Sequence, residues 1–420
     1  MHSKLRTIRR VAPLALLPLA VAACAEDKPL NTFEPRGPQA ESIDNLMLYI
    51  WPIMGIVFVL VIGGAIWIAM RNRVKPEDFD YEDLPEQTHG NIPLELTWTI
   101  APTILLAVIS GFMVQQIWDL ETENEAGELD VMVIGQQWWW EYRYDVDGDG
   151  FIQDGNGDGV VDDHDWTLPL ELILDPDDVV TANELVIPAG EQIDLRLTSR
   201  DVIHSFWIPR LNGKRDTVPG RWHTWSLEAF EPGKYTGWCT EYCGLSHARM
   251  RMSTIALPEA EFDEWLANQA TLADVPTSGD ELAGYELFQN QCASCHVIND
   301  GNLDYTTYDP PLVPGAAPNL THFATRTTFA GGIYNQYTGP GTEATDDALD
   351  VSTYLDLAAL SADPQTREDV RWNSAELKRW IANAPEQKAM DADNQRGMIA
   401  FPQLSDEDLD NIVAYLATLD

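Results

Sequence analysis

The sequence predicts a multidomain membrane protein with a hairpin of two transmembrane helices, a small β-sandwich or Greek-key barrel, and a helical C-terminal domain. Three observations lead to this prediction. Two apolar runs of about 25 residues each lie near the N-terminus. Short β-rich runs broken by Gly and Pro occupy residues 128–258, and residues 280–420 begin and end with helical patterns. At 420 residues the chain is long enough for two or three domains.

The net charge is strongly negative, at -41. Such a chain repels the phosphates of nucleic acid, so a nucleic-acid partner is excluded. Two interpretations of the charge stay open. It can be a solvated surface suited to salty surroundings, or a docking face for a basic partner protein.

Residues 1–23 have the pattern of a signal peptide. Four basic residues precede a short apolar stretch from Val11 to Ala23, which is too short to cross a membrane. The run Val21-Ala22-Ala23-Cys24 resembles a bacterial lipoprotein cleavage box, which would make Cys24 a lipid-modified N-terminus. An ordinary signal peptide with an incidental cysteine is the alternative. Residues 24–42 would then form a short exported segment.

The transmembrane hairpin is expected within residues 43–120, with spans at 46–70 and 94–118. Arg71, Arg73 and Lys75 directly follow the first span, so the connecting loop should lie in the cytoplasm. The N-terminus and everything after the second span then lie on the outer face. Glu95 falls at the cytoplasmic start of the second span, where it is either an interfacial residue or a functional one.

The β domain, residues 128–258, contains soft metal-ligand types. Strands are expected at 130–134, 184–187, 191–198 and 221–227. Two thiolates, two imidazoles and a thioether suit copper better than zinc, which has little use for methionine. Taken singly, the histidine upstream can be a buried core residue and the methionine a core filler. The candidate ligands are His204, Cys239, Cys243, His247 and Met250.

An acidic, Gly-rich insertion at residues 145–178 contains a candidate calcium loop. Gly159 would take its turn position, and Asp stands where the final Glu usually lies. A disordered acidic loop is the alternative. The candidate ligands are Asp154, Asn156, Asp158, the carbonyl of Val160, Asp162 and Asp165.

A short helix and linker, residues 259–279, lead to a domain at 280–420 that carries a haem attachment motif. In Cys292-Ala293-Ser294-Cys295-His296 the two thiols would bond the haem vinyl groups while the imidazole of His296 binds the iron. A chance redox Cys-x-x-Cys pair is the alternative. Ser405 begins the closing helix with a capping pattern. The five cysteines of the chain therefore each receive a role outside a disulfide framework.

The string C-T-E-Y-C-G-L-S-H-A-R-M, preceded by D-V-I-H-S-F-W-I-P, resembles the copper-A signature of cytochrome c oxidase subunit II, whose domain is cupredoxin-like. The resemblance extends from Asn91 to Met252 and includes L-E-L-T-W-T-I-A-P and Q-Q-W-W-W-E-Y-R-Y. It implies that two sulfurs bridge two coppers, that each imidazole binds one copper, and that a thioether is axial. By resemblance the roles are Cys239 and Cys243 as bridges, His204 and His247 as imidazole ligands, Met250 as axial ligand and Glu241 as a ligand through its backbone carbonyl.

The same resemblance implies further roles. The Glu241 side chain would help bind magnesium at the junction with subunit I, and Glu95 would lie at the mouth of a proton pathway. Trp138 matches the family's aromatic electron-input position, although the Trp138–Trp140 cluster can also be explained as sheet-core aromatics. The C-terminal domain resembles an all-α class I cytochrome c, which implies a methionine as sixth iron ligand. Met398 is preferred because M-I-A-F-P-Q-L-S resembles the family's run before the last helix, with Met390 as the alternative.

The fusion of these domains resembles subunit II of caa3-type oxidases. It implies an electron-input subunit of a haem–copper terminal oxidase in a bacterial cell membrane, with both exported domains on the outer face. Electrons would pass from a donor through haem c and copper-A to haem a of subunit I, where oxygen is reduced and protons are pumped. The implied partners are subunits I and III, other oxidase subunits, membrane lipid, and a cytochrome or quinol-oxidising complex as donor. A stand-alone membrane-anchored electron carrier or copper-handling lipoprotein is the alternative. Quinol oxidase subunits characteristically lack the copper ligands.

Overall fold

A computed structural model describes residues 30–73, 90–120, 129–145, 179–301, 317–338, 371–390 and 396–420. Cys24 and the candidate calcium loop, residues 154–165, lie outside the described residues. The chain divides into two compact units, one spanning Glu41–Thr122 and the other made of Met1–Ala40 with Glu123–Asp420.

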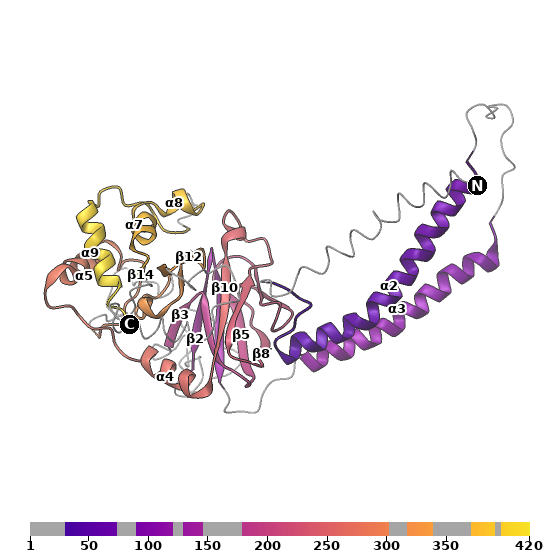
Figure 1. The fold of residues 1–420 in the computed structure, drawn as a ribbon, viewed down its shortest axis with the longest axis horizontal. Coiled ribbons are helices and arrows are strands. Elements are labelled where there is room, and N and C mark those ends of the chain that lie inside the picture. The colour runs from indigo at the N-terminus through magenta and orange to yellow at the C-terminus, as the bar shows by residue number, and fades with distance from the viewer. Residues whose placement is uncertain are drawn as a thin grey trace, which may run out of the picture. The chain divides into compact units, whose positions relative to one another are not determined.

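Two long helices account for the first unit (Figure 1). Helix α2 spans Pro38–Arg71 and α3 spans Ile92–Leu120, so both extend beyond the expected spans. Both are long and apolar enough to cross a membrane, and no residue in the most apolar stretch of either is buried. The side chain of Gln116 in α3 donates a hydrogen bond to the hydroxyl of Ser42 in α2. The predicted helical hairpin is confirmed.

The β domain contains two sheets and a hairpin. The larger sheet has the order β3 (Val179–Ala182), β2 (Trp139–Tyr144), β1 (Asp130–Gln136), β5 (Ile193–Ser199) and β8 (His223–Leu227). The smaller sheet has the order β4 (Glu184–Pro188), β10 (Arg251–Leu257) and β9 (Gly233–Trp238). The hairpin pairs β6 (His204–Trp207) with β7 (Lys214–Thr217). Strand pairs β1–β5 and β4–β10 are parallel.

One hydrophobic core joins the two sheets. Val131 and Val133 of β1, Leu195 of β5, Leu185 of β4 and Ile255 of β10 are all fully buried in it. Alternation of inward apolar residues along a strand places every second side chain in such a core. The predicted β-sandwich is confirmed, and each of the four expected strands overlaps an observed one.

The helical domain, residues 279–420, follows helix α4 (Glu259–Gln269), which lies in the predicted linker. Its helices are α5 (Gly279–Gln291), α7 (Ser374–Ala382), α8 (Ala384–Gln387) and α9 (Asp406–Leu416). Two short strand pairs accompany them, β11 (Thr328–Phe329) with β12 (Tyr334–Asn335) and β13 (Tyr337–Thr338) with β14 (Arg371–Trp372). Ser405 and Asp408 form a reciprocal capping box at the start of α9, as the sequence predicts.

The first and last helices of this domain, α5 and α9, pack closely against each other. A Cβ atom at Gly284 of α5 would lie 1.9 Å from the carbonyl oxygen of Asn411 in α9, so only glycine permits this approach. The ring of Tyr415 in α9 then meets Tyr285 and Phe288 of α5 edge to face, with centroids 5.4 and 5.8 Å apart. This helix pair fixes the end of α5, where Cys292 begins the haem motif.

Candidate metal and haem sites

The candidate copper residues come from one loop and one neighbouring strand. Residues 239–250 connect β9 to β10, with Cys239 directly after β9 and Met250 directly before β10. The amide of Cys239 donates a hydrogen bond of 3.1 Å to the carbonyl of Met250, which closes the loop at its base. His204 is the first residue of β6 and is completely buried. The strand ladder therefore fixes both ends of the loop.

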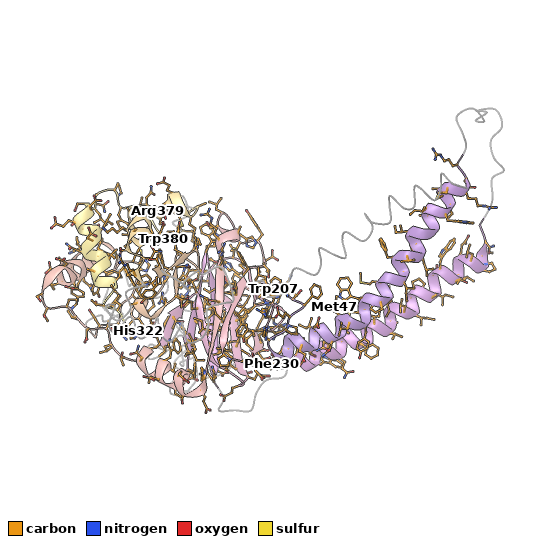
Figure 2. The ribbon with its side chains drawn as sticks, viewed as in Figure 1. Met47, Trp207, Phe230, His322, Arg379 and Trp380 are labelled. Atoms are coloured by element: carbon orange, nitrogen blue, oxygen red, sulfur yellow. The ribbon has the colours of Figure 1, made fainter. Side chains whose placement is uncertain are left out.

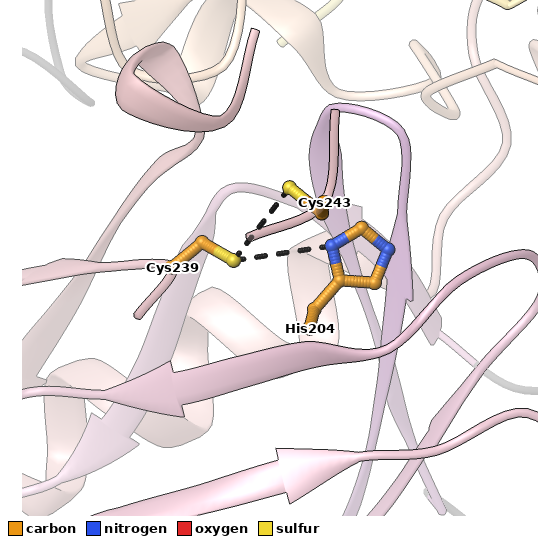
Figure 3. A group of neighbouring side chains, drawn as sticks. All are labelled: His204, Cys239 and Cys243. Carbon is orange, nitrogen blue, oxygen red and sulfur yellow. Dashed lines mark hydrogen bonds between the residues drawn. The ribbon is translucent and has the colours of Figure 1, made fainter. Parts of the chain in front are cut away.

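All six predicted donor atoms converge. The two sulfurs lie 3.8 Å apart, and the Cys239 sulfur lies 3.9 Å from Nδ1 of His204 (Figure 3). The Cys243 sulfur lies 3.5 Å from Nδ1 of His247 and 3.7 Å from the Met250 sulfur. The Glu241 carbonyl oxygen lies 3.3 Å from the Cys239 sulfur.

This arrangement suits two metal ions better than one. The ligand atoms of His204, Cys239 and Cys243 all lie within 4.8 Å of one another, whereas His247 is not part of that group. A single tetrahedral zinc would need both imidazoles and both thiolates around one point. Instead each imidazole meets a different sulfur, and a soft thioether stands beside the pair. The donor set is the one copper prefers.

Asp201 orients the imidazole of His204. Its carboxylate lies 2.8 Å from Nε2 of His204 and also accepts a hydrogen bond of 2.7 Å from the amide of Gln137. Because a carboxylate accepts, Nε2 carries the proton and Nδ1 keeps its lone pair toward the sulfurs. Burial alone would lower the pKa of His204, but Asp201 and the Cys239 thiolate outweigh it and raise that pKa.

The two thiols differ in acidity because they are neighbours. A hydrogen bond from Cys243 lowers the pKa of Cys239 to about 4, against the opposing effect of burial. The pKa of Cys243 is raised, first by its hydrogen bond to Cys239 and then by burial. In the metal-free protein the pair therefore holds one proton, which metal binding would displace.

The three consecutive tryptophans are all buried, but they do different things. The indole N–H of Trp138 donates a hydrogen bond of 2.9 Å to the carbonyl of Cys243, so this side chain contacts the candidate ligand loop. Trp140 lies edge-on to His204 at 5.9 Å and to Phe206 at 5.5 Å. Trp139 is 7% exposed. Core packing explains Trp140, and the electron-input role of Trp138 stays a prediction.

Two other predicted positions are open to partners. The Glu241 side chain is exposed, and its carboxylate accepts a hydrogen bond of 3.1 Å from the amide of Tyr242. Beside it on the loop, Tyr242 is 74% exposed and Leu245 is 62% exposed. Glu95 is exposed in the first turn of α3. The magnesium role of Glu241 and the proton-pathway role of Glu95 stay predictions.

The predicted haem motif begins where α5 ends. The amide of His296 donates to the carbonyl of Cys292 at 3.0 Å, which places both residues on one turn. Nδ1 of His296 lies 2.8 Å from the carbonyl of Pro318 and must donate to it, so Nε2 keeps its lone pair for iron. Burial lowers the pKa of His296 and favours this neutral form. These features suit the imidazole ligand of a c-type haem.

The described surroundings favour Met398 over Met390 as the sixth ligand. Met398 packs against the core of the helical domain, whereas Met390 packs against the core of the β domain. His322, labelled in Figure 2, is not a competing ligand. Its two ring nitrogens face the carbonyls of Asp420 at 2.7 Å and Thr271 at 3.1 Å. The assignment of Met398 stays a prediction.

Sequence reasoning missed two residues close to these sites, Asp201 and Lys388, and a third, Glu184, that contacts the helical domain. Asp201 stands three positions before His204, a spacing that could have indicated an orienting partner. Lys388 contacts Trp138, 250 residues away in the chain, and Glu184 contacts Thr327, 143 residues away. No local sequence pattern predicts contacts between residues so far apart.

Family models match three consecutive parts of the chain. The model for the transmembrane domain of cytochrome c oxidase subunit II matches residues 30–115, and the model for its periplasmic domain matches residues 129–256. A cytochrome c model matches residues 282–420. These parts coincide with the helical hairpin, the β domain and the helical domain.

Curated relatives of this chain include cytochrome c oxidase and quinol oxidase subunits. Cytochrome c oxidase subunit 2 of Alkalihalophilus pseudofirmus is 29% identical over 99% of this chain and 98% of its own length. The probable cytochrome c oxidase subunit 2 of Rickettsia felis is 31% identical over 59% of this chain and 75% of its own length. Quinol oxidase subunit 2 of Bacillus cereus is 28% identical over 71% of this chain and 93% of its own length.

Proposed function

Because this chain belongs to the cytochrome c oxidase subunit II family and ends in a cytochrome c domain, we propose that it is the electron-input subunit of a caa3-type haem–copper oxidase. Bound haem c and copper-A supply one-electron redox chemistry on a route from an outside donor to haem a of subunit I, where oxygen is reduced. The convergence of six soft or carbonyl donor atoms on the loop between β9 and β10 carries the proposal.

The protein prepares the copper site before any metal binds. The two ions would be held by the sulfurs of Cys239, Cys243 and Met250, the imidazoles of His204 and His247, and the Glu241 carbonyl. The hydrogen bond from Cys239 to Met250 holds the loop ends, and Asp201 holds the ring of His204. A site fixed in this way changes little in geometry when its charge changes, which favours fast electron transfer.

The haem-binding residues come from two distant segments. Cys292 and Cys295 would form the covalent bonds, His296 would bind one face of the iron and Met398 the other. Methionine ligation raises the reduction potential relative to two histidines. Because one chain carries both sites, the haem is always near the copper site, and this raises the effective concentration of the electron donor.

The copper loop also presents a surface suited to a partner subunit. Tyr242 and Leu245 are exposed large apolar residues beside the candidate ligands, and the exposed carboxylate of Glu241 accepts a hydrogen bond from the Tyr242 amide. Exposed apolar groups beside a functional site mark protein contact surfaces. Subunit I is the partner proposed for this face, with magnesium bound by Glu241 at the junction and Glu95 opening a proton pathway in the membrane.

Three further features of the proposal fall outside the described residues or rest on topology alone. The basic cluster after the first span supports an outward position for both exported domains.

Mass spectrometry of the mature N-terminus tests lipidation of Cys24, which requires loss of residues 1–23 and addition of acyl mass. Calorimetric titration of calcium into the chain, compared with an Asp158→Asn variant, tests the calcium loop. If the two titrations release the same heat, calcium binding by this loop is excluded.

Co-purification after mild detergent extraction distinguishes the oxidase subunit from a stand-alone carrier. We expect the full chain to retain a partner that bears haem a, detected by its absorption spectrum. A Tyr242→Ala/Leu245→Ala variant should lose most of that partner, whereas Phe230→Ala, an exposed apolar residue elsewhere on the β domain, should retain it. A chain that purifies alone with both centres filled would contradict the oxidase assignment and support the stand-alone carrier.

A further inference from the structure

The helical domain contacts the β domain through two of its segments and through Arg396, whose guanidinium lies 3.9 Å from the Asp201 carboxylate. Residues 327–332 and 387–390 of the helical domain meet residues 246–251 and three single positions, Trp138, Glu184 and Lys234, of the β domain. Both domains belong to the same compact unit of the chain. The contacts in this interface are mainly polar, and several of the groups are charged and buried.

The first polar cluster surrounds the carboxylate of Glu184, which is 4% exposed. It accepts hydrogen bonds from the amide of Thr327 at 2.9 Å and from the hydroxyl of Thr328 at 2.6 Å, and the hydroxyl of Thr327 donates as well. Lys234 of the β domain lies 3.7 Å from the same carboxylate and donates to Thr327 at 2.6 Å. An ion pair of the β domain is thus completed by hydroxyl and amide groups of the helical domain.

The second cluster surrounds the ammonium group of Lys388, which is 4% exposed. It donates to the carbonyl of Trp138 in the β domain at 2.7 Å and to the carbonyl of Ala330 in its own domain at 3.2 Å. The neighbouring Ala389 carbonyl accepts a hydrogen bond of 2.5 Å from Ser246 on the candidate ligand loop. Trp138 donates to the carbonyl of Cys243, so Lys388 is two hydrogen bonds from the copper loop.

A glycine turn permits the close approach at Lys388. Gly331 has φ +78, and a Cβ atom there would lie 2.5 Å from the Lys388 ammonium and 3.1 Å from the Trp138 carbonyl oxygen. The carbonyl of Gly331 accepts a hydrogen bond of 3.3 Å from the amide of Arg251. A side chain at this position would strain the backbone at its positive φ and displace the Lys388 amino group from the Trp138 carbonyl.

Buried charges of this kind favour one arrangement of the domains over others. An alternative docking that covered the same surfaces would leave the Glu184 carboxylate, or the Lys388 amino group whose pKa burial lowers to about 7, without its hydrogen-bond partners, which is unfavourable for a buried polar group. Apolar contacts alone would tolerate sliding, because they are not directional. The two clusters therefore select one relative position of the two domains at the interface.

We propose that Glu184 and Lys388 are positioning residues that hold the helical domain in one fixed place on the β domain. In this arrangement Lys388 donates its hydrogen bond to the Trp138 carbonyl. The haem-bearing domain is then a docked donor and not a swinging one. The electron-transfer consequence rests on the proposed function, whereas the docking itself does not.

Amide hydrogen exchange of the full chain tests the docking without any electron transfer. In Glu184→Gln and Lys388→Met variants, and more so in the double variant, exchange at the Thr327 amide should rise by at least about tenfold. Lys378→Met is the matched control, because Lys378 pairs with Asp410 within the helical domain and makes no contact that defines the interface. Haem content and copper content report that each domain is folded. Unchanged exchange at Thr327 in the double variant, with both cofactors bound, would overturn the proposal.

The rate of electron transfer from haem to copper, after photochemical reduction of the haem, tests the consequence. A docked donor gives a rate that is independent of solvent viscosity, while the double variant should be at least about tenfold slower and slow further as glycerol is added. A viscosity-dependent rate in the unmodified chain would show a swinging domain and overturn the proposal. If a fully loaded chain passes no electron from haem to copper, the proposed function fails, and the exchange experiment still decides the docking.

Discussion

The two candidate redox sites of this chain are built in opposite ways. The copper site lies in one twelve-residue loop, 239–250, plus His204 from an adjacent hairpin, and strand pairing fixes the ends of that loop. The haem site combines Cys292–His296 with a methionine about a hundred residues later in the chain, and its geometry depends on the packing of α5 against α9. The copper loop can lose its metal while the β domain stays folded. The haem site, in contrast, forms only when α5 and α9 are packed together. Substitutions that separate these two outcomes test the contrast.

The largest effect is expected at the copper loop. Cys243→Ser removes one bridging sulfur, so two ions can no longer share an electron, and the copper content should fall from two ions per chain to at most one. Electron paramagnetic resonance of the oxidised chain should lose the shared-electron signal while the haem spectrum is unchanged. His223→Asn, at the half-buried start of strand β8, serves as a control and should leave both signals intact. Retention of the shared signal in Cys243→Ser would refute the ligand assignment.

The next effect concerns the sixth iron ligand. Met398→Leu should abolish the weak absorption band of the iron–sulfur bond in the oxidised protein and lower the haem potential, because a methionine ligand stabilises the reduced state. Met390→Leu is the matched control and should keep the band, since Met390 packs against the core of the β domain. The opposite pattern would transfer the ligand role to Met390.

A smaller effect is expected from the residue that orients His204. Asp201→Asn keeps the size of the side chain but weakens the hydrogen bond that fixes the ring, and outer partners of this kind change metal affinity by about 10- to 100-fold. Competition with a copper chelator measures the change, and the haem spectrum should be unaffected. Asp216→Asn, an exposed carboxylate on strand β7, is the comparison. Equal copper affinity in both variants would remove Asp201 from the site.

The last effect concerns the stability of the helix pair, and it should reach the haem without reaching the copper. Gly284→Ala introduces a methyl group that meets the backbone of α9, and overpacking of this kind costs about 1–3 kcal/mol. Thermal unfolding followed by haem absorption should shift to lower temperature, while copper content stays constant. Glu286→Ala, on the exposed face of the same helix, should leave the transition in place. Loss of copper together with haem stability would show that the two sites do not fold separately.

Local patterns made most of the architecture predictable. The apolar runs of the two helices, the apolar stretch of β1, the alternation in β5, the capping pattern at Ser405 and the spacing within residues 239–250 are all features of neighbouring residues, and each corresponds to an observed element. The resemblance to known families supplied His204, because a lone buried histidine carries little information by itself.

The remaining features depend on contacts between distant segments. Glu184 reads as an ordinary charged residue at the start of a strand, and Lys388 as a surface lysine after a short helix. Only the tertiary structure shows that both are buried against the other domain. The choice between Met398 and Met390 likewise depended on which core each side chain joins.

Electron paramagnetic resonance combined with metal and haem analysis of the full chain tests the central claim most directly. The account predicts two copper ions and one covalent haem per chain, with a copper signal whose hyperfine pattern shows one electron shared by two nuclei. A single zinc ion, or copper with a signal from isolated nuclei, would contradict it and leave only a membrane-anchored cytochrome.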